Sequence, residues 1–226
     1  MAKTYLEQDE IERLEQQATC LRDRLLIRLL SRLGCRISEA LALKVEDIDF
    51  SQGTVTIQHL KERLNLSCPH CQARLGRGHK FCPQCGSEVS QPLSKLQQAH
   101  RRRILPLDEE TLDMLRDFIR RDGTKGLIFG ISRHRAWQVI RGCARQAGLA
   151  GLINPETGRT KGVSPHRLRD AFAVHAVQID DSGDGLRLLQ EHLGHQSIST
   201  TMRYRKVSGE EQREWYQRLW QKKEAT

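Results

Sequence analysis

Two Cys-x-x-Cys units constrain the fold of this 226-residue chain more than any other sequence feature. One runs from Cys68 to Cys71 and the other from Cys82 to Cys85, with ten residues between them. Each short turn directs two thiolates toward one point, and two facing turns complete the tetrahedral four-sulfur shell that Zn²⁺ prefers. We therefore predict a structural zinc site with four ligands, Cys68, Cys71, Cys82 and Cys85. The alternatives are two disulfides or thiols without a partner, and His70 and His79 are nearby candidate ligands.

A zinc ion with four protein ligands has no open coordination position, so we expect it to stabilise its segment and to take no part in chemistry. The other three cysteines, Cys20, Cys35 and Cys143, stand alone, which favours a reducing cytosol over a disulfide framework. The N-terminus lacks the apolar run of a secretory signal, and no stretch is apolar enough to span a membrane. The sequence thus predicts a cytoplasmic protein without a membrane segment.

The cysteines lie in a segment that interrupts a predicted β-hairpin. Gly53 to Gln58 alternates β-branched residues, which predicts a strand, and Arg103 to Leu107 resembles its returning partner. Antiparallel neighbours normally need only a few residues between them. We therefore predict an inserted zinc-ribbon-like module at residues 62–98 and a main domain made of residues 1–61 and 99–226. Basic residues of the module either contact DNA phosphates or a neighbouring protein, or form a solvated face: Arg74, Arg77, His79 and Lys80.

Outside this module, apolar residues spaced three and four positions apart predict helices. One continuous helix is expected over residues 9–33, and a second is expected to begin after Ser38 as its N-cap. Further helices are predicted after Asp108, after Ser132, from Ser164-Pro165, over about 186–193, over about 198–207 and from Ser208. Residues 151–162 have the composition of a loop. The expected fold class is therefore α+β, mainly helical, with a small antiparallel sheet.

The chain carries a formal net charge of +9, because 37 lysines and arginines outnumber 28 aspartates and glutamates. This surplus suits a partner with a phosphate backbone, although basicity alone also fits an ordinary soluble protein. A more specific signal is His166 and Arg169, which lie on one face of the helix that Ser164 and Pro165 begin. The free amides at the start of that helix favour an anion.

Three sequence blocks follow one another in a fixed order. Gly34 to Glu39 reads G-C-R-I-S-E, His166 to Arg169 reads H-R-L-R, and Leu193 to His195 reads L-G-H. Tyr204 follows nine residues after the last of these histidines. In order and spacing the blocks resemble the tyrosine recombinase (phage integrase) family, and the resemblance covers about Leu6 to Val207 apart from the inserted module. It implies the fold of a tyrosine recombinase catalytic domain.

The resemblance also implies a site-specific DNA recombinase whose nucleophile is Tyr204. The phenol would attack the scissile phosphate and leave a 3′-phosphotyrosine and a free 5′-hydroxyl, which conserves the bond energy. Arg36 and Arg169 would stabilise the negative charge of the pentacoordinate transition state, so neither a catalytic metal nor a nucleotide cofactor is implied. His166 is the family's candidate proton acceptor, and His195 would donate a hydrogen bond to the phosphate.

In this family the leaving 5′-oxygen takes its proton from a lysine in the hairpin between the second and third strands. Lys61, at the end of the first predicted strand, is assigned this role, with Lys95 as the alternative. A third interpretation is that Lys61 is an ordinary solvated residue. Asp170 departs from the family pattern, because many relatives have a histidine there.

Double-stranded DNA is the implied partner, with self-assembly into a dimer or tetramer on DNA and therefore a nucleoid-associated location. Most family members carry a helical N-terminal domain that clamps the duplex, and this sequence starts only about thirty-five residues before Arg36. The chain is thus expected to be either a minimal member or a catalytic fragment. The tail at 208–226 has an apolar face with Trp215 and Leu219, which would dock on the next protomer or on its own core.

Two other functions fit parts of the pattern. A type IB topoisomerase would use nearly the same residues to relax supercoils without exchanging DNA partners. A zinc-ribbon DNA-binding regulator would bind DNA without catalysis, and its function would survive Tyr204→Phe.

Overall fold

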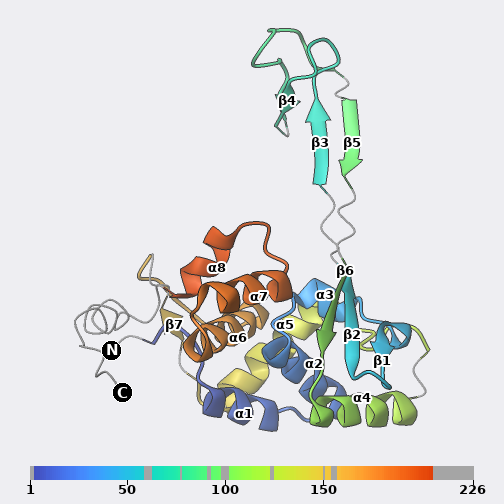
Figure 1. Cartoon of the computed structure of the whole chain (residues 1–226), viewed down its shortest axis with the longest axis vertical. Coiled ribbons are helices and arrows are strands. Elements are labelled where there is room, and N and C mark those ends of the chain that lie inside the picture. Colours follow the sequence, from blue (N-terminus) through green and yellow to red (C-terminus); the bar gives the residue numbers. More distant parts are fainter. Residues whose placement is uncertain are drawn as a thin grey trace, which may run out of the picture. The chain divides into compact units, whose positions relative to one another are not determined.

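The structure is a computed structural model that describes residues 3–58, 63–76, 78–90, 93–97, 102–122, 125–149, 151–153 and 157–205. The chain divides into two compact units, one made of Met1–Ile57 and Arg103–Thr226 and the other of Gln58–Arg102. Within the described residues, helices occur only in the larger unit (Figure 1). No helix of this described part is long and apolar enough to cross a membrane.

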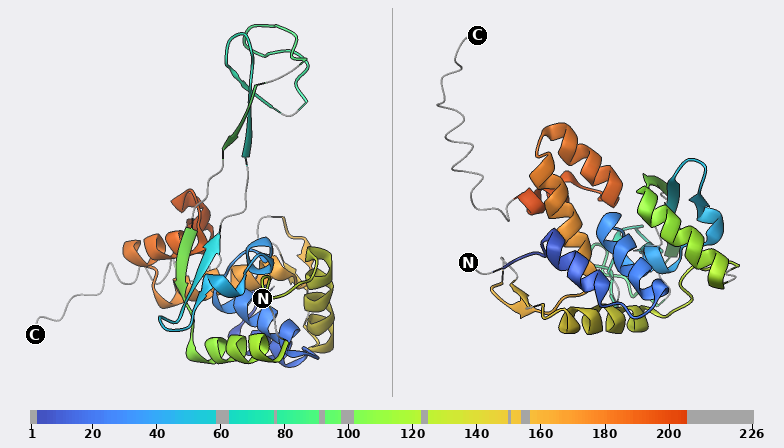
Figure 2. Two further views of the ribbon diagram at one scale, coloured as in Figure 1. Left: turned by 90° about the vertical axis from the view of Figure 1, so that its right-hand side faces the viewer. Right: turned by 90° about the horizontal axis from the view of Figure 1, so that it is seen from below.

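The larger unit is built around α2 (Leu21–Arg32), whose side chains from Leu25 to Leu30 are all buried. Burying one leucine or isoleucine side chain contributes roughly 1.5–3 kcal/mol, so α2 is the centre of the core. The helices that contact α2 include α1 (Gln8–Gln16), α4 (Glu109–Asp122), α5 (Arg133–Gln146) and α6 (Pro165–Ile179). Of these, α5 runs along the outside of the helices (Figure 2).

The remaining helices of this unit lie on either side of α6 and α2. Both α7 (Gly183–Leu193) and α8 (Ile198–Arg205) pack on α6 and on each other. The short α3 (Ile37–Leu41) contacts α2 and α5, and a 3-10 turn, η1 (Val45–Asp47), follows it. The fold therefore brings two segments that are distant in sequence to α6: the chain before α3, and the α7–α8 pair.

The predicted antiparallel strands are present as a three-stranded sheet in the order β1-β2-β6. Its strands are β1 (Ile48–Asp49), β2 (Thr54–Gln58) and β6 (Arg102–Pro106). Alternate residues of β2, Val55 and Ile57, are buried, as the alternating pattern predicts. The interpretation of Arg103 to Leu107 as the returning partner is therefore confirmed.

Side-chain caps form at two of the predicted helix starts. Asp108 Oδ1 accepts a hydrogen bond from the Thr111 amide (3.0 Å), and Ser132 Oγ accepts one from the Arg135 amide (3.2 Å), as predicted. Ser38, however, is not an N-cap, because α3 already begins at Ile37. The carboxylate of Glu39 instead accepts a hydrogen bond from the Arg36 amide (3.0 Å).

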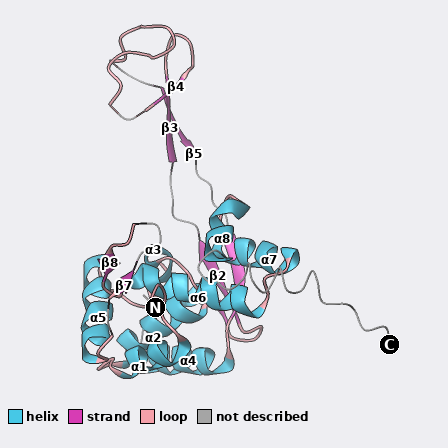
Figure 3. Cartoon of the chain, turned by 90° about the vertical axis from the view of Figure 1, so that its left-hand side faces the viewer, coloured by secondary structure: helices cyan, strands magenta, loops and turns pink. Residues whose placement is uncertain are grey.

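Two further expectations are wrong. Residues 151–162 are not only loop, since β7 (Leu152–Ile153) pairs with β8 (Thr160–Lys161) in an antiparallel ladder (Figure 3). The continuous helix over 9–33 is broken between Gln17 and Cys20, whose backbone is extended. Apolar spacing alone misses this break because both helices bury the same kind of stripe.

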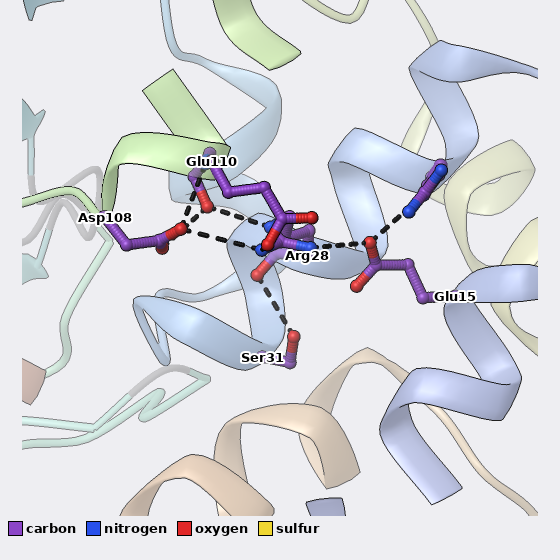
Figure 4. A network of polar contacts seen from close by, with 7 residues as sticks. Glu15, Arg28, Ser31, Asp108 and Glu110 are labelled. Atoms are coloured by element: carbon purple, nitrogen blue, oxygen red, sulfur yellow. Dashed lines mark hydrogen bonds and ion pairs between the residues drawn. The ribbon is translucent and has the colours of Figure 1, made fainter. Parts of the chain in front are cut away.

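The break permits a buried network of charges around Arg28 (Figure 4). Arg28, 5 % exposed, binds Glu15 on α1 through Nη1 (3.0 Å) and Thr111 on α4 through Nε (3.0 Å), and it also contacts Glu110. In one straight helix, Glu15 and Arg28 would lie roughly 20 Å apart. The pairing satisfies a buried charge, which would otherwise be strongly destabilising, and ties α1, α2 and α4 together.

The smaller unit is a second antiparallel sheet, in the order β4-β3-β5. Its strands are β3 (Arg63–Ser67), β4 (Arg74–Leu75) and β5 (Leu93–Gln97). The register places Arg63 opposite Gln97 and Ser67 opposite Leu93. Cys68, Leu75 and Cys82 form its buried cluster. The α+β, mainly helical fold class is thus confirmed, while the sequence did not indicate the strands of this unit.

Candidate active site and metal site

Arg169 on α6 is the centre of the candidate site. Ser164, with extended backbone, and Pro165 at the first helical position begin α6 and put Arg169 in its second turn. The guanidinium is 3 % exposed and donates to the carbonyl of Gly34 (2.6 Å) and to that of Leu193 (2.9 Å). Nη2 also lies 3.0 Å from His195 Nε2. One arginine therefore joins the segments before α3 and after α7.

His195 lies between this arginine and α8. Gly194, in the left-handed conformation (φ 65°), ends α7 and turns the chain so that the imidazole faces inward. Its Nδ1 lies 2.9 Å from Thr201 Oγ1. Burial lowers the pKa of His195 to about 4, assisted by the positive charges of Arg169, Arg36 and Arg103. The ring is therefore neutral at pH 7, with Nε2 accepting from Arg169 and Nδ1–H donating to Thr201.

Arg36 is held beside Arg169 by a buried carboxylate. Glu39, 2 % exposed, binds Arg36 Nη1 through Oε1 (2.8 Å) and Arg103 Nη2 through Oε2 (2.9 Å). Burial alone would raise the pKa of Glu39, but the hydrogen bond from the Arg36 amide and the charges of both arginines outweigh it and lower the pKa. The positive charge of Arg36 in turn contributes, after burial, to lowering the pKa of Arg169, because the two guanidinium groups are close.

Arg103 on β6 is a member of this group that sequence reasoning missed. Its Nε and Nη1 are buried without a hydrogen-bond partner among the described residues. A Cβ placed at Gly194 would lie 1.8 Å from Arg103 Nη1, so the guanidinium packs directly on the backbone next to His195. The sequence predicted a strand that begins at Arg103, and so placed this residue in the sheet, but it did not indicate which side chains Arg103 contacts.

Tyr204 on α8 faces α6. Its Oη donates a hydrogen bond to Asp170 Oδ1 (3.2 Å), and its ring stacks near that of His195, with centroids 6.2 Å apart. Burial raises the pKa of Tyr204 to about 12, and the negative charge of Asp170 adds to the rise while Arg169 opposes it. The phenol is consequently protonated at rest and needs a proton acceptor before it can act as a nucleophile.

His166 lies in the first turn of α6 and faces solvent. Its side chain is 76 % exposed, and Nδ1 lies 3.9 Å from Asp170 Oδ1. Arg167 Nη1 donates to the other oxygen of Asp170 (3.3 Å). The described contacts thus place Asp170 between His166 and Tyr204. Asp170 was visible in the sequence as a departure from the family pattern, without a role.

Two of the predicted features lie wholly or partly outside the described residues. Lys61 lies outside the described residues, and Lys95 is on β5, where only the backbone is described. The helix predicted from Ser208 also lies outside them. His192, which is outside the family blocks, stacks on Phe172 and lies 3.0 Å from the Leu33 carbonyl oxygen through Nε2, a structural position.

The smaller unit brings four thiols together. The sulfur atoms of Cys68, Cys71, Cys82 and Cys85 all lie within 4.8 Å of one another. Sγ–Sγ distances are 3.7 Å for Cys68–Cys85 and 3.5 Å for Cys71–Cys82, too long for disulfides, so that alternative is wrong here. They match the edge of roughly 3.8 Å in a tetrahedron with Zn–S bonds of about 2.3 Å. The arrangement fits a metal ion.

The neighbouring histidines do not join this cluster. The ring of His79 packs against Gly76, whose amide donates to Nδ1 (3.4 Å), and the group of candidate ligands consists of the four cysteines. The sequence profile of the zinc-ribbon domain matches residues 67–89, a range that contains all four cysteines.

Known proteins resemble the chain in sequence. It is 31 % identical over 203 residues to the tyrosine recombinase XerD of Mycobacterium leprae, covering 86 % of this chain and 51 % of that protein. It is 27 % identical over 208 residues to the tyrosine recombinase XerA of Pyrococcus furiosus, covering 88 % of this chain and 54 % of that protein. The chain therefore spans about half the length of the curated relatives it matches.

Solved structures resemble it in fold. The crystal structure of XerA recombinase superposes with a TM-score of 0.62 at 22 % identity, covering 97 % of this chain and 64 % of that one. XerH site-specific recombinase bound to its palindromic difH substrate gives 0.61 at 20 % identity, covering 96 % and 53 %. At these identities the likeness concerns the fold. The profile of the phage integrase family matches residues 4–75 and 93–211, and the chain belongs to that family.

Proposed function

We propose that the chain cleaves and rejoins double-stranded DNA at specific sites through a 3′-phosphotyrosine formed on Tyr204. One observation carries this proposal: Arg169 touches His195 and the segment before Arg36, while Tyr204 stacks beside His195. Four groups suited to phosphoryl transfer thus converge from the start of α3, from α6, from the α7–α8 turn and from α8. The family and the names of the relatives support the same reaction.

In this mechanism Arg36 and Arg169 bind the non-bridging oxygens of the scissile phosphate. Charge builds on these oxygens in the transition state, and preformed donors in a partly buried site stabilise it more than water does. Glu39 orients Arg36, and the carbonyls of Gly34 and Leu193 orient Arg169. Because the guanidinium groups supply the required positive charge, we propose that the reaction uses no cofactor. Lys61 remains our candidate for the proton of the leaving 5′-oxygen.

His195 is proposed to assist at the phosphate, and the structure defines what this requires. Its Nε2 is engaged by Arg169, so donation to a phosphate oxygen calls for the tautomer with the proton on Nε2. Arg169 would then turn its Nη2 to the phosphate and release the imidazole. The hydroxyl of Thr201, 2.9 Å from Nδ1, can serve either tautomer because it both donates and accepts.

A basic surface on α5 supports DNA as the partner. The helix contains no acidic residue, and its arginines are exposed: Arg133, Arg135, Arg141 and Arg145. Arg141 also lies over the ring of Trp137, 4.7 Å from its centroid. In Figure 2 this helix runs along the outside of the helical unit. Exposed side chains whose charges are all positive suit a phosphate backbone. We further propose assembly into a dimer or tetramer on DNA and a nucleoid-associated location in the cytoplasm.

The cysteine cluster is proposed to bind Zn²⁺ in a purely structural role, through Cys68, Cys71, Cys82 and Cys85. With four thiolates at tetrahedral spacing, the ion has no position left for a substrate. We propose that residues 62–98 form this inserted module and that residues 1–61 and 99–226 form the catalytic domain.

Covalent trapping tests the proposed reaction. The chain is incubated with a pool of nicked DNA duplexes that carry a randomised core, and adducts are separated by denaturing electrophoresis. We expect an adduct that peptide mapping assigns to Tyr204, lost in Tyr204→Phe and kept in the matched control Tyr5→Phe. DNA binding by wild type without any adduct would instead support the zinc-ribbon regulator.

A second pair of assays separates recombination from topoisomerase activity. Adduct sequences recovered from the pool are placed twice on one plasmid, and exchange between the two copies is scored beside relaxation of supercoils. A recombinase yields exchanged products that need both copies. Relaxation of a plasmid with one copy, without exchange on the plasmid with two, would favour the type IB topoisomerase.

A further inference from the structure

The carboxylate of Asp170 lies between the phenol of Tyr204 and the ring of His166. Tyr204 Oη donates to Asp170 Oδ1 over 3.2 Å, and His166 Nδ1 is 3.9 Å from the same oxygen. The side chain of Asp170 is 17 % exposed, whereas that of His166 is 76 % exposed. A proton that leaves the phenol therefore meets a half-buried carboxylate first and an imidazole open to solvent second.

We propose that Asp170 is a catalytic residue that accepts the phenolic proton of Tyr204 and passes it to His166. The inference rests on the proposed function, in which Tyr204 attacks a DNA phosphate. It differs from the role that the family resemblance gives to His166, because here the residue next to Arg169 is an aspartate that contacts the reacting oxygen directly.

During cleavage, each proton and each electron pair has a defined destination. The Oη–H bond of Tyr204 breaks and its proton goes to Asp170 Oδ1, while the Oη electron pair forms the bond to phosphorus. The bond from phosphorus to O5′ breaks, and its electron pair leaves on O5′, which takes a proton from the general acid. Asp170 then releases its proton to His166 Nδ1, and the imidazole exchanges it with water. Rejoining reverses each transfer, so protonated Asp170 returns the proton to the departing phenolate.

The positive charge of Arg169 favours release of the phenolic proton. On α6, Arg167 donates to Asp170 Oδ2 and His166 lies 3.9 Å from Oδ1, and from α8 Tyr204 donates to Oδ1. Arg169 lowers the pKa of the phenol, so it stabilises the phenolate that forms when the proton leaves. The acidity of the phenol also rises as its oxygen bonds to phosphorus, so a carboxylate is a sufficient base in the transition state.

The contact between Asp170 and Tyr204 could also have the opposite effect and restrain Tyr204. A carboxylate beside a phenol also opposes ionisation of the phenol, and it could simply hold Tyr204 inactive on α6. The two roles predict opposite effects for Asp170→Asn, which keeps the shape and a hydrogen-bond acceptor but cannot take a proton. A base predicts slower cleavage, and a restraint predicts faster cleavage.

The experiment measures single-turnover adduct formation on a duplex recovered from the random pool, in which sulfur replaces the leaving 5′-oxygen. A thiolate leaves without a proton, so this substrate reports the proton acceptor and not the general acid. We expect Asp170→Asn to react about 100-fold more slowly than wild type, within the range for general base catalysis, with a rate that rises about tenfold per pH unit as hydroxide replaces the carboxylate. Wild type should show a much shallower dependence on pH.

A second variant separates chemistry from folding. Asp170→Ala leaves room for a small carboxylate, so added formate should restore a part of its rate, which a merely structural role would not produce. Asp184→Asn, which removes an exposed carboxylate on α7, is the matched control and should react like wild type. Melting temperature and gel shift confirm that each variant is folded and binds the duplex.

The outcomes distinguish this inference from the proposed function. If wild type forms no Tyr204 adduct, the proposed function fails and this inference falls with it. If wild type reacts and Asp170→Asn is equally fast or faster, with no rescue of Asp170→Ala by formate, only the assignment of Asp170 is overturned.

Discussion

Replacing Glu39 with glutamine tests how the arginines of the site are held. The carboxylate is 2 % exposed and binds the guanidinium groups of Arg36 and Arg103 at 2.8 and 2.9 Å. Glu39→Gln keeps the volume and removes the charge. Arg103, already with two unpartnered nitrogens in the described structure, would then have no countercharge at this position.

The magnitude follows from the burial of the pair. Removing one partner of a buried ion pair costs about 3–5 kcal/mol, because an uncompensated charge stays in the interior. For a chain of this size each kcal/mol lowers the melting temperature by roughly 2–4 °C, so we expect a fall of roughly 6–20 °C. Arg36 should also lose its orientation, and adduct formation by the folded variant should slow.

The assay is thermal unfolding followed by circular dichroism at 222 nm, which reports the helices of the larger unit. The matched control is Glu46→Gln, which removes an exposed partner of Lys44 and should leave the melting temperature close to that of wild type. Adding Arg103→Met to Glu39→Gln should recover part of the loss, since it removes the unpaired charge. A melting temperature within 2 °C of wild type for Glu39→Gln would refute the reasoning.

The lowered pKa of Glu39 predicts how the stability of the protein changes with pH. Its folded value lies below the usual one, so its stabilisation is complete above the unfolded pKa of about 4.3 and is lost as pH falls through the folded value. The stability difference between wild type and Glu39→Gln should therefore shrink on acidification below about pH 4. A difference that stays constant from pH 6 to pH 3 would contradict this assignment.

Three other predictions are independent of DNA. His195 should titrate in NMR spectra with a midpoint near its pKa of about 4, and a midpoint near 6.5 would contradict its burial. As pH falls from about 6.5 to 4, the unfolded chain binds a proton at this histidine before the folded chain does, so the free energy of unfolding should decrease. Gly194→Ala should destabilise the protein by about 1–3 kcal/mol in urea unfolding, because φ is +65° and the new Cβ would clash with Arg103. Gly183→Ala, with open space around it, should leave stability nearly unchanged, and equal effects of the two substitutions would refute the contact of Gly194 with Arg103. The protein should bind one zinc ion per chain, and removing the ion with a chelator should increase proteolysis at residues 58–102 while the helical circular dichroism signal persists. Cys68→Ser should show the same increase in proteolysis, and resistance to proteolysis that chelation does not change would contradict a structural role.

Local sequence patterns predicted the elements that depend on local chemistry. Caps at Asp108 and Ser132, alternation at Val55 and Ile57, and a proline after Ser164 each act within a few residues, so the corresponding helices and strand were found. The four cysteines were found for the same reason. The break before Cys20 was missed, because the contact that accompanies it, between Glu15 and Arg28, joins two helices and leaves no local pattern.

The site shows the same division. The family blocks supplied Arg36, Arg169, His195 and Tyr204, and the structure puts them near one another, but roles in catalysis remain proposals. What the blocks could not supply is what each side chain touches. The contact of Asp170 with Tyr204 and the support of Glu39 by Arg103 join residues 34 and 64 positions apart, and no local pattern encodes either.

The register of β3 and β5 bears on how a protein of this kind can acquire a module. Arg63 and Gln97 stand opposite each other, so the polypeptide enters and leaves the cysteine-bearing unit at neighbouring points, and the host strands β2 and β6 are themselves adjacent. For the sheet that contains β2 and β6, the inserted unit is equivalent to a long turn, and the entropic cost of closing a loop grows only slowly with its length. A gene encoding an uninterrupted hairpin could therefore gain or lose this segment in one event without altering the pairing of the strands that flank it.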